Sequence, residues 1–464
     1  MKAGPLKILL IFIVICAAYS AWMTGFTFVF SECTLFPNYN MLAKALLKGQ
    51  LFIDEAPPVD ASMVHGKRYL YVGPVPALFH IPSLLLFNRS TPTGLVIAIL
   101  CAGISVLLVM ILKELTPPNE MRKLRGIRLC FVGAFVLSGF SLLMVTIPSI
   151  HHEAICSAAF FLTVAIYLLI RARDRGYRIS TVAALFGALA LSLCIGSRFS
   201  YVISAAVVGS ILIGGMIRNS DRIPTSEIIR TGVLGLGLTM LMVGLLLYYN
   251  HARFGTYGEF GVKYLTSIYT EYFARGHFLR YDHVPYNLWS MFWRIPQLAP
   301  EFPFLMLPAF ILKVQSIGLM PYFLINVNEL SASVFCLMPI MLLAVVPLLA
   351  SWRNPNVCRL TTYFILSVLF GVQCLTISLT PASTARYYYD FLPIMMMMSY
   401  IGALWFQKRA SRPNVMIASL AVISVVLSFA LPMNALTLYA HFISYKSPLL
   451  QVFPVPVVEG ARRV

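Results

Sequence analysis

The feature that most constrains this chain is a series of long apolar runs that contain almost no charge. The first, "ILLIFIVICAAYSAWMTGFTFVF", extends from Ile8 to Phe30. A helix rises about 1.5 Å per residue, so about 20 apolar residues cross a bilayer core roughly 30 Å thick. Such runs recur, and only 11% of the 464 residues are charged, whereas soluble domains have about 25%. The sequence therefore predicts an all-α polytopic membrane protein.

About eleven membrane-spanning helices are predicted, and they make residues 1–464 a single transmembrane domain. The first apolar run is longer than the roughly 7–15 residues of a signal peptide, so we expect an uncleaved helix. The predicted spans lie near residues 8–30, 93–112, 128–148, 153–170, 180–196, 200–217, 230–249, 333–351, 360–379, 388–406 and 414–432.

The net charge of +18 is distributed over short loops. Basic clusters such as "KELTPPNEMRKLRGIR" and "FQKRASR" lie between apolar runs, and short cytoplasmic loops of membrane proteins carry this excess of Lys and Arg. We therefore predict a multi-pass protein of the cell (inner) membrane, with a cytoplasmic N-terminus and an extracytoplasmic C-terminus. The sequence contains no contiguous basic patch with interleaved aromatic residues, which argues against a nucleic-acid partner.

Two large outer loops are predicted, at residues 31–92 and 250–332. In the first, "NMLAKALLKGQLF" places Leu42 and Leu46 on one helical face, which predicts an amphipathic juxtamembrane helix that ends at Gly49. The following "GPVPALFHIPSLLLF" is apolar, but it is short and contains three prolines. It is predicted to be a juxtamembrane or re-entrant segment rather than a straight spanning helix.

Three ionisable residues, His151, His152 and Glu153, lie together at the predicted outer entry to a helix. One interpretation is structural, because an acid in the first turn offsets the helix dipole. The other is functional, because a carboxylate between water and an apolar wall is suited to general-base catalysis. Glu153 is therefore a candidate catalytic residue, and the two histidines are candidate substrate-binding residues. Adjacent helical residues point in different directions, so these three do not form a metal site by themselves.

Three arginines lie at predicted outer helix ends: Arg198 in "GSRFSYV", Arg253 in "NHARFGTYGEFG" and Arg386 in "STARYYYDFLP". A helix-end arginine can extend its charge to the interface without any other role. The guanidinium group also binds phosphate through two parallel hydrogen bonds. We therefore predict that these arginines bind a donor phosphate, with Tyr387 beside them as a substrate-binding residue.

The first predicted outer loop carries the acids Glu32, Asp54 and Asp60. A solvated loop would carry some acids in any case, and "DEAPPVD" fits that interpretation. Because loops often expose catalytic groups, the three acids are further candidates for a catalytic carboxylate.

The order of these features resembles the GT-C superfamily of integral-membrane glycosyltransferases, which includes the protein mannosyltransferases and the lipid A aminoarabinose transferases. The segment "YNMLAKALLKGQLF" looks like the juxtamembrane helix of that family, and "YVGPVPALFHIPSLLLF" looks like its Pro-rich segment. The segments "HHEAICSAAFFLTVAIYLLIRAR", "ALSLCIGSRFSYV" and "ARYYYDFLPIMMM" are similar to its helices with an acidic or a basic residue at one end. The resemblance covers most of the chain.

The resemblance implies a GT-C-like fold and a transfer of sugar from a polyprenyl-phosphate donor to a glycan, lipid or protein acceptor at the outer face of the bilayer. In that mechanism a first-loop carboxylate activates the acceptor hydroxyl, and cations stabilise the departing phosphate. A divalent cation is left open as a cofactor. The family's Asp before the juxtamembrane helix is missing, since "TLFPN" stands there. Glu32, Asp54 or Asp60 would then have to serve, or the activity would be lost or different.

Two other functions stay open. A flippase or other transporter of lipid-linked sugars would bury ionisable groups near the bilayer midplane, often within internal repeats. The predicted spans are almost free of charge and no repeat is visible, which favours an enzyme. The third alternative is a non-catalytic envelope-assembly protein on a GT-C scaffold, because the expected Asp is missing.

Overall fold

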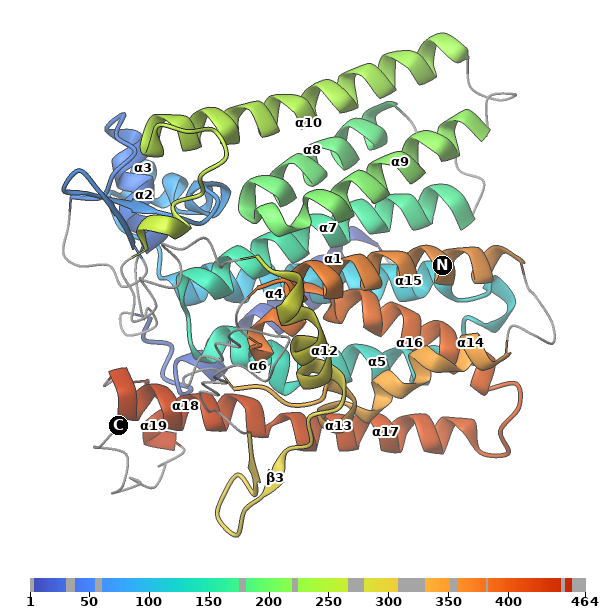
Figure 1. The fold of residues 1–464 in the computed structure, drawn as a ribbon. Helices are drawn as coiled ribbons and strands as arrows, with labels where there is room; N and C mark the ends of the chain where they lie inside the picture. Colours follow the sequence, from blue (N-terminus) through green and yellow to red (C-terminus); the bar gives the residue numbers. More distant parts are fainter. Residues whose placement is uncertain are drawn as a thin grey trace.

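The computed structural model describes residues 4–30, 38–54, 61–174, 181–218, 224–265, 279–307, 330–350, 357–380, 383–443 and 447–452. Within these residues the chain is a bundle of helices with two short β-hairpins (Figure 1).

Seven helical segments among the described residues are long and apolar enough to cross a membrane. They comprise α1 (Pro5–Met23), α4 (Thr93–Leu115), α5 (Arg125–Val136) with α6 (Gly139–Thr146), α7 (Ile150–Asp174), α10 (Thr225–Phe254), α15 (Val357–Ser378), and α17 (Pro413–Ser428) with α18 (Ala430–Ile443). This confirms the prediction of a multi-pass, predominantly helical membrane protein.

The prediction of eleven spans is confirmed only in part, because four of the predicted ranges hold shorter apolar helices. These are α8 (Thr181–Ser197), η3 (Phe199–Tyr201) with α9 (Val202–Arg218), η6 (Pro339–Val345) with α14 (Val346–Ala350), and α16 (Leu392–Phe406). The smaller described elements not introduced elsewhere are η2 (Pro118–Glu120), η5 (Tyr281–His283), α12 (Val284–Phe292), α13 (Val334–Leu337) and α19 (Leu449–Val452).

The predicted juxtamembrane helix is α2 (Asn38–Leu47), and Gly49 follows it with a φ of +71°. After it the chain forms a hairpin of β1 (Ala61–Val64) and β2 (Lys67–Leu70). The two turn residues, His65 and Gly66, both have positive φ, as a tight type I′ hairpin requires. This hairpin, and a second one of β3 (Gln297–Leu298) and β4 (Leu305–Met306), depart from the purely α-helical prediction.

The segment "GPVPALFHIPSLLLF" forms two short helices, η1 (Val75–Phe79) and α3 (Ile81–Phe87). Figure 1 shows α2, α3 and the first hairpin together at one end of the bundle, which we call the loop end. The helix α7 begins at the loop end, and α8 and α10 finish there. The N-terminal label lies at the opposite end, as the predicted topology requires, although the membrane orientation itself stays a prediction.

The centre of the bundle is α16, in which every residue from Leu392 to Leu404 is buried. A helix that is apolar on all sides is stable only when other helices surround it. Gly402 allows one such close approach, because a Cβ there would overlap the carbonyl oxygen of Leu343. By contrast, α1 and α10 leave large apolar side chains such as Leu6 and Leu241 exposed, and a bilayer would cover these surfaces.

Candidate functional site

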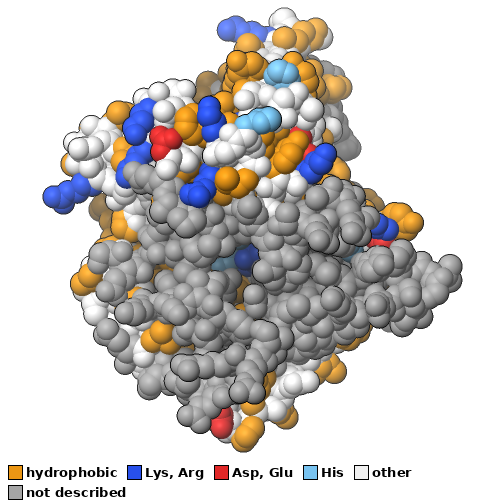
Figure 2. All heavy atoms as spheres, turned by 60° about the vertical axis from the view of Figure 1, so that its left-hand side comes forward, with side chains coloured by type: hydrophobic (Ala, Val, Ile, Leu, Met, Phe, Trp, Pro, Cys, Tyr) orange, Lys and Arg blue, Asp and Glu red, His pale blue; other side chains and the backbone are white. Residues whose placement is uncertain are grey.

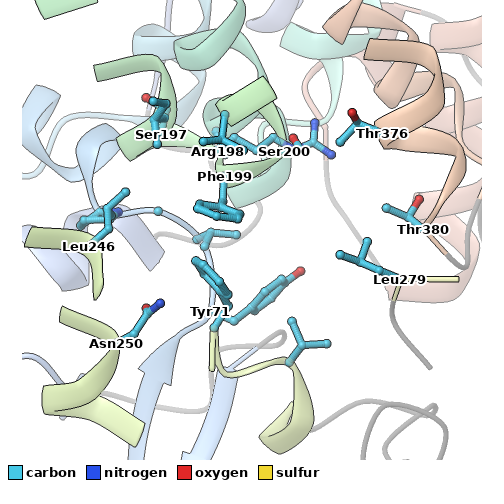
Figure 3. Close-up of a pocket in the computed structure, with 18 of the residues that line it drawn as sticks. Tyr71, Ser197, Arg198, Phe199, Ser200, Leu246, Asn250, Leu279, Thr376 and Thr380 are labelled. Atoms are coloured by element: carbon cyan, nitrogen blue, oxygen red, sulfur yellow. The ribbon is translucent and has the colours of Figure 1, made fainter. Parts of the chain in front are cut away.

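A cavity of about 600 Å³ lies at the loop end of the bundle. Its wall combines the chain after β2 with the first turn of α7 and the ends of α8, α10 and α15. Figure 3 shows Arg198 near Phe199 and Ser200, with Thr376 and Thr380 coming from a different helix. The polar or ionisable residues of the lining are Tyr71, His151, Ser197, Arg198, Ser200, Tyr249, Asn250, Arg253, Glu259, Thr376, Thr380 and Tyr387.

The surface around this end is rich in cations. Figure 2 looks onto it and shows more Lys and Arg side chains than Asp and Glu among the hydrophobic ones on its described upper part.

Two glycines bring the first predicted outer loop against the end of α8. A Cβ on Gly73 would overlap the carbonyl oxygen of Gly196 and lie 2.7 Å from that of Ser197. A Cβ on Gly196 would in turn overlap a methyl group of Val75. Because backbone atoms cannot move away as a side chain can, this contact requires glycine, and it fixes one wall of the cavity beside Arg198.

Arg198 is held on one side and open on the other. It has an extended backbone, with φ −154° and ψ 114°, between α8 and η3. Its Nη1 donates a hydrogen bond to Oδ2 of Asp390, and its guanidinium carbon lies 4.8 Å from the centre of the Tyr387 ring. Nε and Nη2 have no hydrogen-bond partner among the described residues. They are therefore available to a ligand in the cavity.

Asp390 lies at the end of η7 (Ala385–Asp390), and its side chain is fully buried. Tyr201 donates a second hydrogen bond to it, with 2.6 Å between Oη and Oδ1. Burial raises the pKa of Asp390, and the charge of Arg198 and the hydrogen bond from Tyr201 offset only part of that rise. The pair thus keeps a carboxylate inside the protein, where it fixes the orientation of Arg198.

Arg386 and Tyr387 extend this cluster. The guanidinium carbon of Arg386 lies 5.4 Å from the centre of the Tyr387 ring, so the ring lies near two guanidinium groups, those of Arg198 and Arg386. Tyr387 lines the cavity, whereas Arg386 is buried and does not. Such a contact between a cation and an aromatic ring holds the ring in place beside the cavity.

Arg253 lines the cavity, but its guanidinium group is also bonded to other parts of the protein. Its Nη1 donates to the carbonyl oxygen of Leu70, its Nη2 donates to Oδ1 of Asn250 at 2.7 Å, and its guanidinium carbon lies 3.6 Å from the Tyr249 ring centre. These contacts connect the end of α10 to the end of β2. The structure therefore gives Arg253 a bracing role, which the sequence did not predict, and its phosphate-binding role stays a prediction.

The three residues that open α7 point to different places. His151 lines the cavity, and both of its ring nitrogens are 3.4 Å from the hydroxyl of Tyr71. His152 is buried and is not part of the lining. Glu153 is fully buried, and its Oε1 lies 2.7 Å from Nε2 of His80, which is also fully buried.

The pairing of Glu153 with His80 joins α7 to the short helices η1 and α3 of the first predicted outer loop. Glu153 does not line the cavity, although its neighbours Ala154 and Ile155 do. The catalytic role of Glu153 stays a prediction, and the structure adds a structural role to it.

In its described part, the structure places none of the predicted first-loop acids in the cavity as a catalytic base. Asp54 is exposed and does not line the cavity, and Glu32 and Asp60 lie outside the described residues. The described lining contains one carboxylate, that of Glu259. The sequence analysis did not select it as a catalytic candidate, although its position between Gly258 and Gly261 in an aromatic segment is typical of a functional loop.

No group of three or more His, Cys, Asp or Glu residues that could hold a metal ion occurs in the part of the chain that the structure describes. The divalent cation left open by the sequence therefore has no candidate set of ligands there.

Comparisons with known proteins identify the fold. No protein-family model matches the chain, and no curated protein matches it. The structure is similar to that of ArnT from Cupriavidus metallidurans, solved bound to undecaprenyl phosphate, with a TM-score of 0.50, 10% identity, and coverage of 94% of this chain and 78% of ArnT. A second similar structure is the oligosaccharyltransferase AglB from Archaeoglobus fulgidus, in complex with an inhibitory peptide and a dolichol-phosphate. Its TM-score is 0.48 at 11% identity, over 92% of this chain and 55% of AglB.

The chain thus matches the fold of a GT-C integral-membrane glycosyltransferase over nearly its whole length. This confirms the fold that the sequence resemblance implied. A shared fold does not by itself transfer an activity.

Proposed function

We propose that this chain is a glycosyltransferase that moves a sugar from a polyprenyl-phosphate donor to an acceptor at the loop end of its bundle. The donor's lipid tail would lie along the apolar helices, with its phosphate in the cavity. The acceptor would be a glycan, a lipid or a protein. The predicted topology puts this end at the extracytoplasmic face of the cell membrane.

The observation that carries this proposal is the geometry of Arg198. Asp390 and Tyr387 fix one side of its guanidinium group, while Nε and Nη2 have no partner among the described residues. A cation positioned in advance in a cavity stabilises negative charge as it develops, at little cost in reorganisation. The departing group of this reaction is a phosphate whose charge grows as the bond to the sugar breaks.

The rest of the cavity supports a lipid-linked donor. Beside the charged group its wall is apolar, with Ile155, Ile203 and Leu246. Ile203, near the start of α9, is also exposed, so an apolar chain would find contact area there. Such a site can hold a charged head group and an apolar chain together.

The other predicted residues fit this scheme to different degrees. Tyr387 and His151 line the cavity and are proposed to contact the donor or acceptor. Arg386 supports Tyr387 from behind the wall. Of the predicted catalytic acids, Glu153 is the one whose partner is described, and that partner is His80.

A transporter is the second candidate, and the location of the charges disfavours it. Two contacts between ionisable side chains near this cavity, Glu153 with His80 and Arg198 with Asp390, lie at helix ends. Transporters commonly place such groups near the bilayer midplane.

Mass spectrometry of envelope glycans and lipids tests the proposal. The strains to compare carry the intact gene, a deletion, or a deletion with Arg198→Ala or Arg198→Lys. Arg122→Ala serves as the matched control, because Arg122 is exposed and lies outside the cavity.

We expect deletion to remove one sugar. Arg198→Ala should fail to restore it, Arg198→Lys should restore it in part, and Arg122→Ala should restore it fully. Full restoration by Arg198→Ala at normal protein level would show that the phosphate site is wrong. A deletion strain with unchanged glycans and lipids would refute the transferase function.

A further inference from the structure

Glu259 differs from the other acids around the site in its access to the cavity. It follows the end of α10 and precedes η4 (Val262–Tyr264). It lines the cavity together with its neighbours Gly258 and Phe260. No other Asp or Glu of the described residues lines the cavity, whereas the side chains of Glu153 and Asp390 are fully buried, against His80 and Arg198 respectively.

The structure holds the carboxylate of Glu259 in place through one of its two oxygen atoms. Its Oε1 accepts a hydrogen bond from the backbone N–H of Gly261 at 2.7 Å and a longer one from that of Lys263 at 3.5 Å. Glu259 forms no ion pair with the described residues, and its Oε2 has no hydrogen-bond partner among them. One oxygen therefore fixes the group, and the other can act on a ligand.

The loop that carries Glu259 is braced against the first predicted outer loop. Oγ of Ser62, in β1, donates to the carbonyl oxygen of Gly261 at 2.7 Å. Gly261 has a φ of +90°, and a Cβ on it would lie 2.5 Å from the Phe254 ring and 2.7 Å from Oγ of Ser62. A second bridge pairs Ser62 with Leu265. These contacts hold the carboxylate on the same cavity wall as the end of α10.

The charges of the cavity suit a base. Arg198 and Arg253 line the same space as Glu259. A carboxylate on a cavity wall that also holds a positioned cation provides the two groups that glycosyl transfer needs: a proton acceptor for the attacking hydroxyl and a cation for the departing phosphate.

We propose that Glu259 is the catalytic base of this protein, which places that role in the second predicted outer loop rather than the first. This inference rests on the proposed transfer from a polyprenyl-phosphate sugar. Oε2 of Glu259 takes the proton of the acceptor hydroxyl, and the hydroxyl oxygen forms a bond to the anomeric carbon. The bond between that carbon and the phosphate oxygen breaks, and its electron pair leaves with the polyprenyl phosphate, whose charge Arg198 stabilises.

Glu259→Gln is the decisive variant, because its amide oxygen can still accept the hydrogen bond from Gly261 while the basic oxygen is lost. Glu259→Ala removes both the basic oxygen and the acceptor of the hydrogen bond from Gly261. It therefore measures how much that hydrogen bond contributes. Glu32→Gln, Asp54→Asn and Asp60→Asn are the matched variants of the first-loop acids. Two quantities are measured for each: the transferred sugar in complemented deletion cells, and binding of undecaprenyl phosphate to the purified full-length protein in lipid nanodiscs.

General-base catalysis contributes roughly 100- to 10,000-fold to a rate. We therefore expect Glu259→Gln to reduce transfer at least about 100-fold while its affinity for undecaprenyl phosphate stays within about threefold of the intact protein, since RT ln 3 is close to 0.6 kcal/mol. Glu259→Ala should lose transfer and bind less tightly, because the loop is no longer anchored.

Two results would overturn the inference. Full transfer by Glu259→Gln would exclude a base role, and if Asp60→Asn or Glu32→Gln abolished transfer in the same series, the base would lie in the first loop. Loss of both transfer and lipid binding by Glu259→Gln would assign Glu259 a structural role. Failure of the transferase proposal itself is distinguishable, because deletion of the gene would then leave every sugar in place.

Discussion

The contact between Arg198 and Asp390 gives a prediction that the structure lets us work out in magnitude. In Asp390→Asn the amide oxygen can still accept the hydrogen bond from Tyr201, but the negative charge is lost. Asp390 is fully buried, and the Arg198 side chain is 18% exposed. Breaking a buried ion pair costs about 3–5 kcal/mol, because a charge is left without compensation. Since Arg198 retains some access to water, we expect the low end, about 3 kcal/mol of unfolding free energy.

Denaturant titration of the purified protein in detergent measures this loss. Asp282→Asn is the control, because Asp282 also pairs with an arginine, Arg280, whose side chain is 28% exposed against 18% for Arg198, so we expect a smaller loss there. Undecaprenyl phosphate should also bind more weakly to Asp390→Asn, by about 10- to 100-fold, if the reoriented Arg198 loses a charge-assisted hydrogen bond worth 1.5–3 kcal/mol.

The double variant Arg198→Gln/Asp390→Asn tests whether the contact between these two side chains causes the loss of stability. Removing both charges leaves no uncompensated group, so the double variant should be more stable than the sum of the single losses predicts. If the loss of unfolding free energy in the double variant equals the sum of the two single losses within about 0.5 kcal/mol, the reasoning is refuted, because the two side chains then do not stabilise one another.

The same pair predicts a pH dependence. Burial raises the pKa of Asp390, and Arg198 offsets part of that rise. In Arg198→Gln that offset is gone, so the folded state binds the proton of Asp390 more tightly than the unfolded state does. Stability then falls as the pH rises, and the defect of Arg198→Gln should be largest at neutral pH and shrink at about pH 5. A defect that does not vary with pH would refute this reasoning, because it would mean that Asp390 binds its proton no more tightly in the folded variant than in the unfolded one.

Two further predictions concern the walls of the site. Gly73→Ala should lose about 1–3 kcal/mol of unfolding free energy from overpacking, because its Cβ would meet backbone carbonyl oxygens. The control Gly237→Ala should be neutral or stabilising, because a Cβ there would meet nothing within 4 Å. Thermal unfolding of both variants in detergent checks this. His80→Ala should lose about 3–5 kcal/mol, because it leaves the buried carboxylate of Glu153 without its partner, and Glu153→Gln in the same protein should restore part of that loss. An unchanged melting temperature for His80→Ala would show that Glu153 does not need this partner.

The helices follow from the sequence because their length and apolarity are local properties. The predicted span at residues 93–112 corresponds to α4 (Thr93–Leu115), and the predicted amphipathic helix corresponds to α2. The first hairpin was not predicted, since strands of four residues are too short for a periodic pattern to be distinguished from loop. Its turn, "HG", is nevertheless a signal that sequence reasoning could have used, because glycine adopts positive φ readily.

The site was predictable as a region but not as a set of contacts. Alternation of spans across the bilayer placed Arg198, Arg253 and His151 at one end, and all three line one cavity. The partners that decide what each group can do are distant in the chain: His80 is 73 residues from Glu153, and Asp390 is 192 residues from Arg198. A single sequence contains no signal for such pairings, so it could not separate an acid that is paired and buried from one that is open to the cavity.

The packing of α16 bears on whether this chain catalyses or transports. The cavity lies at the loop end, where Tyr387 and Asp390 precede this helix. From there α16 runs through the bundle with every residue from Leu392 to Leu404 buried, and Gly402 lies against the backbone of Leu343. A route for a polar sugar through the interior would have to separate these contacts, and well-packed interiors resist such changes. A substrate that enters and leaves at the loop end or from the bilayer needs no such separation, so the packing favours chemistry at one face of the membrane.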